Sequence, residues 1–295
     1  MSIHVQVAAA RRRFRDAGIS GTESDLDARL LAQYVLGWTT ERFLTDAHAQ
    51  EPEGFSPQYE TLVARRATRE PLAYIVGVRE FWGLDFQVTP AVLIPRQETE
   101  YIVEEVLAIL GQLRAAAPGT AVAAPVVRVA DIGTGSGCIA IAIAHSAPNV
   151  HVVATDISSE ALVVARQNAE RNGVAGRVEF FTASFLGGID GDFDVIASNP
   201  PYVRELDRGG IGANVRHEPE VALYGGDDGL LHIEAVLDTA VHKLRPHGWL
   251  VMEIGLGQED DVTALVSARP RLAVRRIRND LQGIARTFVI QREGQ

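Results

Sequence analysis

The stretch DIGTGSG at residues 131–137 decides the fold of this chain. It follows an apolar segment, residues 126–130, that predicts a strand, and it precedes a helix predicted to start at about Cys138. Its glycines permit a tight turn and a close approach of the backbone to a ligand. A strand, a glycine-rich loop and a helix in this order predict a cofactor site at the carboxyl end of the strand.

Strands and helices alternate on both sides of this loop. Alternation at this spacing indicates an α/β fold with a parallel, doubly wound sheet. We expect strands at residues 126–130, 150–155, 178–182, 193–198 and 250–254, with apolar-alternating stretches at 272–277 and 287–290. We expect helices from about Cys138, through Asn168, from about Leu230 and from about Asp260.

The region before the sheet has a different pattern. Residues 1–75 predict a small domain of short helices that handles the substrate, with Leu26, Leu31 and Tyr34 at helical spacing. Residues 76–97 predict a β-hairpin linker, because apolar residues alternate around Gly83. A helix is expected over 98–113, and the segment 115–125, rich in Ala, Pro and Gly, is expected to be a loop.

Composition excludes several classes of protein. The chain has 295 residues, of which 46% are hydrophobic and 22% charged, as in an ordinary globular protein. No apolar run approaches the roughly 20 residues of a membrane span, so we expect a cytoplasmic protein without membrane contact. Cys138 is the only cysteine, which excludes an internal disulfide and a thiolate metal cluster, and the histidines show no metal-ligand spacing.

The net charge of −10 argues against unaided, stable binding to long nucleic acid, which needs clustered Lys and Arg. The one basic cluster is Arg11-Arg12-Arg13 with Arg15. It predicts the solvated face of a helix, and contact with RNA or an acidic partner is the alternative.

Asp156 ends the second predicted strand of the sheet, 19 residues after Gly137. An acid at this position can accept hydrogen bonds from both ribose hydroxyls of a nucleoside. Two alternatives stay open from these features: Asp156 can cap the next helix, and the glycine loop can serve packing or a dinucleotide.

The tetrapeptide Asn199-Pro200-Pro201-Tyr202 follows the strand at 193–198 and therefore reaches the same sheet edge as the glycine loop. A planar amide or aromatic amino nitrogen is a poor nucleophile because its lone pair is delocalised. The side-chain oxygen of Asn199 and the carbonyl of Pro200 can accept its two N–H bonds and aim the nitrogen at an electrophilic methyl group. The alternative is an Asn-Pro turn with a chance tyrosine.

The flanking residues suit the same chemistry. Pro200 and Pro201 fix φ and stiffen the accepting carbonyl. Tyr202 can lie against the flat substrate group, and a core aromatic is its alternative. Together with the nucleoside site, the tetrapeptide predicts methyl transfer from S-adenosylmethionine to a planar nitrogen. A dehydrogenase would not need this arrangement of residues.

Nearly the whole chain resembles the HemK/PrmC family of protein-(glutamine-N5) methyltransferases. The resemblance rests on both motifs above and on REFWGL at 79–84, LIPRQETE at 93–100, and EP at 218–219 with AL at 222–223 and GDDGL at 226–230. It implies a class I, Rossmann-like methyltransferase domain over 98–295, whose seven-stranded, mostly parallel sheet ends in an antiparallel strand. It also implies methylation of the glutamine in the Gly-Gly-Gln motif of class I peptide chain release factors, in translation termination.

The resemblance assigns the cofactor to Gly133, Thr134, Gly135, Ser136, Gly137, Asp156 and Asn199, and the substrate glutamine to Asn199, Pro200, Pro201 and Tyr202. The family often has an acid near the adenine where this chain has Ala183-Ser184-Phe185, so we count Ser184 as a cofactor contact through backbone groups. The long segment 203–226 is expected to be a lid or substrate-contacting loop.

Three alternatives for the function remain. A ribosomal-protein glutamine methyltransferase shares this chemistry. An adenine-N6 methyltransferase of nucleic acid has a similar tetrapeptide but needs a basic groove. A cofactor-binding module without catalysis is the third.

Overall fold

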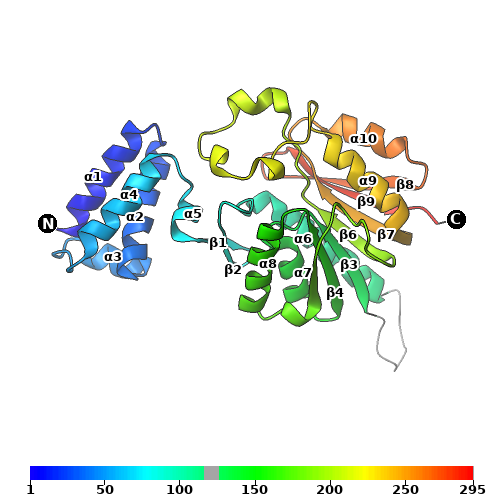
Figure 1. The fold of residues 1–295 in the computed structure, drawn as a ribbon, viewed down its shortest axis with the longest axis horizontal. Coiled ribbons are helices and arrows are strands. Elements are labelled where there is room, and N and C mark those ends of the chain that lie inside the picture. Colours follow the sequence, from blue (N-terminus) through cyan, green and yellow to red (C-terminus); the bar gives the residue numbers. More distant parts are fainter. Residues whose placement is uncertain (116–125, 295) are drawn as a thin grey trace. The chain divides into compact units, whose positions relative to one another are not determined.

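The computed structural model describes residues 1–115 and 126–294, so most of the loop expected at 115–125 lies outside the described residues. The chain forms two compact units, one of Met1–Val78 with Gly212–His217 and the other of Arg79–Ile211 with Glu218–Gln295 (Figure 1). None of the helices in the described ranges combines the length and the apolar character that a bilayer crossing requires.

The first unit is helical, as its sequence pattern predicts. Its core is formed by apolar side chains from all the longer helices, such as Phe14 and Leu31, whereas Leu26 and Tyr34 are exposed although they share the helical spacing. Helical spacing alone therefore did not show which of these residues face the core and which lie at the exposed side of the same helix, Gly21–Leu36. The helices are α1 (Ile3–Asp16), α2 (Gly21–Leu36), α3 (Thr40–Asp46), α4 (Phe55–Ala67) and α5 (Leu72–Val76).

The arginine cluster lies on α1, with Arg12, Arg13 and Arg15 exposed. Arg13 pairs with Glu60, and Arg15 Nη2 lies 2.7 Å from Asp25 Oδ1. Both pairs stand in solvent, as expected for a solvated helix face.

Arg66 of α4 organises the interior of the helical unit. Its side chain is 1% exposed, and its guanidinium donates to Asp27 Oδ2 at 2.6 Å and to Glu23 Oε1 at 2.5 Å. Asn214 Oδ1 accepts from Arg66 Nη1 at 3.3 Å and from Arg69 Nε at 3.2 Å. These bonds explain why Gly212–His217, part of the segment expected to be a lid, belongs to the helical unit.

The second unit is built on one seven-stranded sheet, in the order β5-β4-β3-β6-β7-β9-β8. Of the seven strands, β9 alone runs opposite to the other six, so the predicted α/β fold with its antiparallel last strand is confirmed. The strands are β3 (Val127–Ile132), β4 (Val150–Asp156), β5 (Val178–Thr182), β6 (Phe193–Ser198), β7 (Leu244–Glu253), β8 (Leu272–Asn279) and β9 (Ala285–Arg292).

Successive residues of each central strand enter opposite cores, because side chains alternate across a sheet. Val129 packs in the core under α6 (Glu100–Ala115), α7 (Cys138–Ser146) and α8 (Ser159–Arg171). Ala130 packs in the core under α9 (Leu231–Lys243) and α10 (Glu259–Ser267). Helices therefore cover both faces (Figure 1), and the strands read as continuous apolar runs.

The predicted hairpin is formed by β1 (Val78–Phe81) and β2 (Leu84–Gln87). Trp82 and Gly83 make the turn with φ of 57° and 70°, and a positive φ at both central residues matches the twist of a two-residue hairpin. Phe81 and Phe86 pack edge to face in the first core of the second unit, with ring centroids 6.0 Å apart.

The remaining short elements are 3-10 helices. They are η1 (Gln97–Thr99), η2 (Ala175–Arg177), η3 (Glu205–Gly210), η4 (Val215–His217) and η5 (Glu220–Ala222). The last three lie in the segment 203–226, whose two ends are connected by a β-bridge between Val203 and Tyr224.

We predict that Arg66→Met destabilises the helical unit by about 3–5 kcal/mol, because it leaves the Asp27 carboxylate buried without its partner. Native-state hydrogen exchange of the α4 amides in the full chain measures this opening free energy. The matched control is Arg15→Met, which removes an exposed pair and should cost about 1 kcal/mol or less. Equal costs for the two variants would contradict the structural role of Arg66.

Candidate active site

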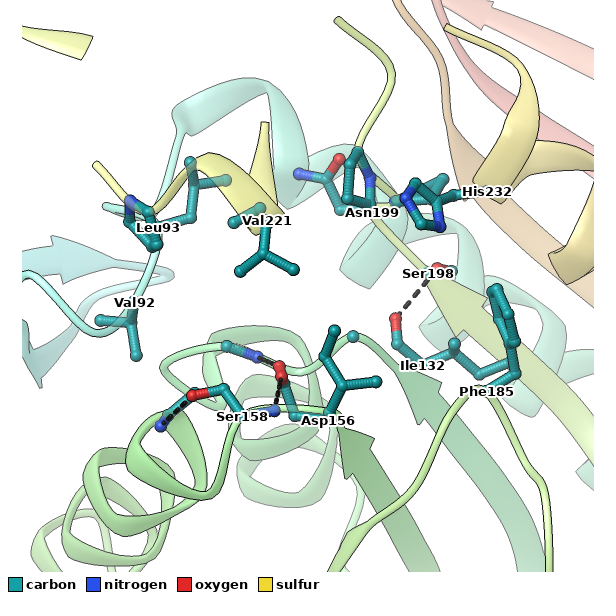
Figure 2. A pocket seen from close by; sticks show the side chains of 18 of the residues that line it. Val92, Leu93, Ile132, Asp156, Ser158, Phe185, Ser198, Asn199, Val221 and His232 are labelled. Carbon is teal, nitrogen blue, oxygen red and sulfur yellow. Dashed lines mark hydrogen bonds between the residues drawn. The ribbon is translucent and has the colours of Figure 1, made fainter. Parts of the chain in front are cut away.

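A cavity of about 170 Å³ lies in the second unit at the carboxyl ends of β3, β4 and β6. Most of its wall is apolar, and Asp156 and Asn199 are among its few polar side chains. Figure 2 shows Val92, Leu93 and Val221 on one side, Asp156 and Ser158 below, and Asn199, His232 and Phe185 opposite. The predicted site residues that line it are Gly133, Gly135, Asp156, Ser184, Asn199, Pro200 and Pro201.

The glycine-rich loop is tied to the end of β4 by its backbone. The N–H groups of Gly133 and Thr134 both donate to the carbonyl of Thr155 at 2.9 Å. Gly135 N donates to Asp156 Oδ2, also at 2.9 Å. The loop therefore presents Gly133 and Gly135 to the cavity in a fixed conformation.

Asp131 has a structural role that the motif alone did not reveal. Gly137 stands at the N-cap of α7 without a side chain to cap it, and Asp131 Oδ2 instead accepts from Ala140 N at 3.1 Å and from Thr134 Oγ1 at 2.6 Å. Asp131 is fully buried, and its Oδ1 has no hydrogen-bond partner among the described residues. This burial raises the pKa of Asp131 to about 7.

Asp156 lies at the end of β4, as predicted. Its Oδ1 accepts from Ser158 N at 2.9 Å, and the N-cap of α8 is Ser158, whose Oγ accepts from Ala161 N at 3.1 Å. Ser158, and not Asp156, therefore caps this helix. An ionised carboxylate has about four acceptor sites, so Asp156 keeps acceptor capacity for a ligand in the cavity.

Thr134, Ser136 and Gly137 were predicted as cofactor residues but are not among the described residues that line the cavity. Gly137 serves helix packing, because a Cβ there would lie 2.8 Å from Ile141 Cδ1 and 3.2 Å from Ala165 Cβ, at a φ of 82°. Thr134 and Ser136, which belong to the same loop, are both buried.

Asn199 belongs to a chain of hydrogen bonds that runs into the protein. Its Nδ2 donates to Thr99 Oγ1 at 3.1 Å, and Thr99 Oγ1 donates to Glu253 Oε2 at 2.7 Å. The hydroxyl of Tyr202 donates to the other oxygen, Glu253 Oε1, at 3.0 Å. Burial raises the pKa of Glu253, a carboxyl group that is 2% exposed.

Tyr202 lies at the second core, which was the alternative to its predicted place against the substrate. Its ring packs with the second core, its hydroxyl faces Glu253, and it is not among the described residues that line the cavity. Burial raises the pKa of Tyr202, so its phenol stays protonated. Direct contact between Tyr202 and a substrate stays a prediction.

The backbone of the tetrapeptide is held by close contacts that require glycine. A Cβ at Gly225 would lie 2.6 Å from the carbonyl oxygen of Pro201, and one at Gly229 would clash with that of Tyr202. Gln258 Nε2 donates to the carbonyl of Tyr202 at 3.2 Å. The glycine at position 229 of the motif at 226–230 is therefore required by its close contact with the backbone of the tetrapeptide.

Several residues that line the cavity were not assigned to the site from the sequence. They are Val92, Leu93, Phe185, Val221 and His232. The sequence feature that could have indicated Leu93 and Val221 is the family motif that contains Glu218. Glu218 Oε2 accepts from Ile94 N at 3.1 Å, and Glu218 Oε1 lies 2.5 Å from Arg96 Nη2. Glu218 therefore joins the motif at 93–100, which contains Leu93, to the motif at 218–219, which lies next to Val221; both Leu93 and Val221 line the cavity. Burial lowers the pKa of His232, which favours its neutral form.

We predict that Asp131→Asn changes how stability depends on pH. The native pKa of about 7 exceeds the unfolded value of about 3.9, so the folded protein holds a proton that the unfolded chain releases. The stability contributed by protonated Asp131 is present below about pH 4 and is lost as the pH rises through about 7. Relative to the variant, the native protein should lose up to about 1.4 kcal/mol of unfolding free energy per pH unit in this range.

Urea denaturation of both proteins between about pH 4 and pH 7 measures this difference. Parallel pH profiles would contradict the raised pKa of Asp131.

Two family models match this chain, the methyltransferase small domain over residues 120–220 and the PrmC N-terminal domain over residues 7–77. A solved structure, the catalytic domain of hMettl16, aligns with 78% of this chain and 82% of its own with a TM-score of 0.57 at 15% identity, which supports the fold alone.

Curated relatives extend the match to nearly the full length. The release factor glutamine methyltransferase of Bradyrhizobium diazoefficiens is 37% identical over 95% of this chain and 93% of its own. That of Moorella thermoacetica is 37% identical over 99% of both chains, and that of Geobacter sulfurreducens is 47% identical over 70% of this chain and 68% of its own. With its methyltransferase sheet and matching helical unit, the chain belongs to the HemK/PrmC family of release factor glutamine methyltransferases.

Proposed function

We propose that this protein transfers the methyl group of S-adenosylmethionine to the side-chain amide nitrogen, N5, of the glutamine in the Gly-Gly-Gln motif of class I peptide chain release factors. The observation that carries the proposal is the fixed amide of Asn199. Asn199 lines the cavity, and its nitrogen is engaged by Thr99 at 3.1 Å, which leaves its oxygen available to accept a hydrogen bond from another group.

The residues at the cavity fit S-adenosylmethionine. Asp156 has acceptor sites for the ribose hydroxyls, and Gly133 and Gly135 allow close approach of the cofactor to the backbone. The apolar wall that includes Phe185 and Val221 suits the adenine, with Ser184 beside it. The unpartnered Oδ1 of Asp131 leaves a further hydrogen-bond acceptor beneath the glycine loop.

The bound sulfonium supplies an electrophilic methyl group, whose bond to sulfur breaks as its bond to the amide nitrogen forms, with the electron pair left on sulfur. Asn199 Oδ1 and the carbonyl of Pro200 accept the two N–H bonds of the glutamine and hold its nitrogen in line. Orientation of this kind can supply on the order of 7–11 kcal/mol of the barrier. The nitrogen loses its extra proton to solvent after transfer, so no catalytic base is needed beforehand.

The choice of substrate is supported by the relatives, which are named for release factor glutamine methylation. The net charge of −10 disfavours a long nucleic acid as substrate. A release factor as substrate places the protein in the cytoplasm. A glutamine of a ribosomal protein would use the same oriented amide, and is therefore the second candidate.

The substrate is identified by incubating the protein with methyl-labelled S-adenosylmethionine and, separately, a class I release factor, a ribosomal protein mixture, and DNA. We expect the label on the glutamine of Gly-Gly-Gln, located by mass spectrometry. Label on a ribosomal protein or on DNA instead, with none on the release factor, would overturn the proposed substrate.

Two substitutions should separate catalysis from cofactor binding. We expect Asn199→Ala to slow single-turnover methyl transfer by roughly 10²–10³, because one oriented contact at the reacting nitrogen is lost. We expect Asp156→Ala to weaken binding of S-adenosylmethionine, measured by calorimetry. A near-normal transfer rate in the first variant, or an unchanged Kd in the second, would remove that residue from its proposed role.

A further inference from the structure

The side-chain amide of Asn199 can serve the reaction in only one of its two orientations. Rotation by about 180° exchanges its oxygen and nitrogen with little change in shape, since the two ends differ chiefly in hydrogen bonding. With the oxygen toward the substrate, Asn199 accepts an N–H of the reacting amide. With the nitrogen there, two N–H groups would face each other.

Thr99 removes this ambiguity because a hydroxyl has one proton. An ionised Glu253 can only accept, so the Thr99 proton is directed to Glu253 Oε2 at 2.7 Å and Thr99 Oγ1 presents a lone pair to Asn199. A lone pair can only accept, and it therefore selects the Nδ2 end of the amide, 3.1 Å away.

We infer that Thr99 and Glu253 are positioning residues, which fix the Asn199 amide with its oxygen toward the substrate nitrogen through the hydrogen-bond chain Glu253–Thr99–Asn199. This inference rests on the function proposed above and adds two residues that do not touch the cavity. Thr99 and Glu253 are both 2% exposed, so water does not compete for these bonds.

The fold holds this chain of bonds rigidly at each end. Glu253 ends β7 and is paired with Thr287 of β9. Thr99 lies in η1, within the motif at 93–100, and the neighbouring Glu100 accepts from Trp82 N at 2.9 Å.

Glu253 also accepts from the hydroxyl of Tyr202 at 3.0 Å. The two polar side chains of the catalytic tetrapeptide are thereby fixed by one buried carboxyl group, Asn199 through Thr99 and Tyr202 directly. This arrangement gives the motif at 93–100 a role in the chemistry although Thr99 does not line the cavity.

The test compares Thr99→Val, which has nearly the same shape without the hydroxyl, with Thr99→Ser, which keeps it. We expect Thr99→Val to slow single-turnover transfer to the release factor by about 10- to 100-fold, the usual scale for losing a partner that orients a reacting group. Thr99→Ser should stay within about threefold of the wild type, and the Kd for S-adenosylmethionine should be unchanged in both.

The matched control is Thr287→Val. Thr287 is also fully buried beside Glu253, but its hydroxyl has no hydrogen-bond partner among the described residues. Its transfer rate should therefore change little. Equal rates for Thr99→Val and Thr287→Val, or equal losses in Thr99→Val and Thr99→Ser, would overturn the inference.

A double variant tests whether the two residues act as one unit. Glu253→Met should slow transfer at least as much as Thr99→Val, and adding Thr99→Val to Glu253→Met should cost less than about threefold more, since residues that act together are not additive. Fully multiplicative losses would mean that the two residues act separately.

Nuclear magnetic resonance gives a readout that does not depend on the substrate. In ¹⁵N-labelled protein, the Asn199 side-chain amide, assigned with Asn199→Asp, should exchange slowly in the wild type and in Thr99→Ser and faster in Thr99→Val. If the wild type fails to methylate the release factor, this pattern still supports the positioning role while the proposed function fails. The same exchange rate in all three proteins would refute the positioning role itself.

Discussion

The parallel pairing of β3 with β4 on one side and β6 on the other is the constraint on which the site depends. It brings three strand ends to one edge, so the glycine loop, Asp156 and Asn199 meet although they are far apart in the sequence. Hydrogen bonds to backbone carbonyls secure this edge. The N–H groups of Gly133 and Thr134 donate to the carbonyl of Thr155, and Ser198 Oγ donates to the carbonyl of Ile132 at 2.9 Å (Figure 2). No single loop therefore determines the cavity.

Buried carboxyl groups connect the loops around this edge. Asp131 caps α7 in place of a glycine, Glu218 joins two distant motifs, and Glu253 anchors both ends of the tetrapeptide. A buried carboxyl group is costly unless its oxygens are hydrogen-bonded. This cost makes each of them specific for one arrangement of its partners, which suits the proposed role of the site in orienting an unreactive nitrogen.

The sequence predicted the residues whose local pattern carries their role. The glycine loop, Asp156 and Asn199 each follow a strand, and strand periodicity is a local property of the chain. Tyr202 could not be placed in this way, because its ring lies beside Gly255 and its hydroxyl donates to Glu253, both from later in the chain. Nothing in the sequence around Thr99 indicated its contacts, and only its place in the family motif at 93–100 marked it.

The α/β architecture and the positions of the glycine loop and the tetrapeptide follow from local sequence patterns, because backbone propensity and side-chain alternation act over a few residues. Which groups hold the loop and the tetrapeptide in place depends on contacts between distant parts of the chain. The bonds from Thr99 to Glu253 and from Asn214 to Arg66 span more than 140 residues. Contacts of that separation depend on the packing of the whole sheet or helical unit, and no pattern in a short stretch of sequence specifies them.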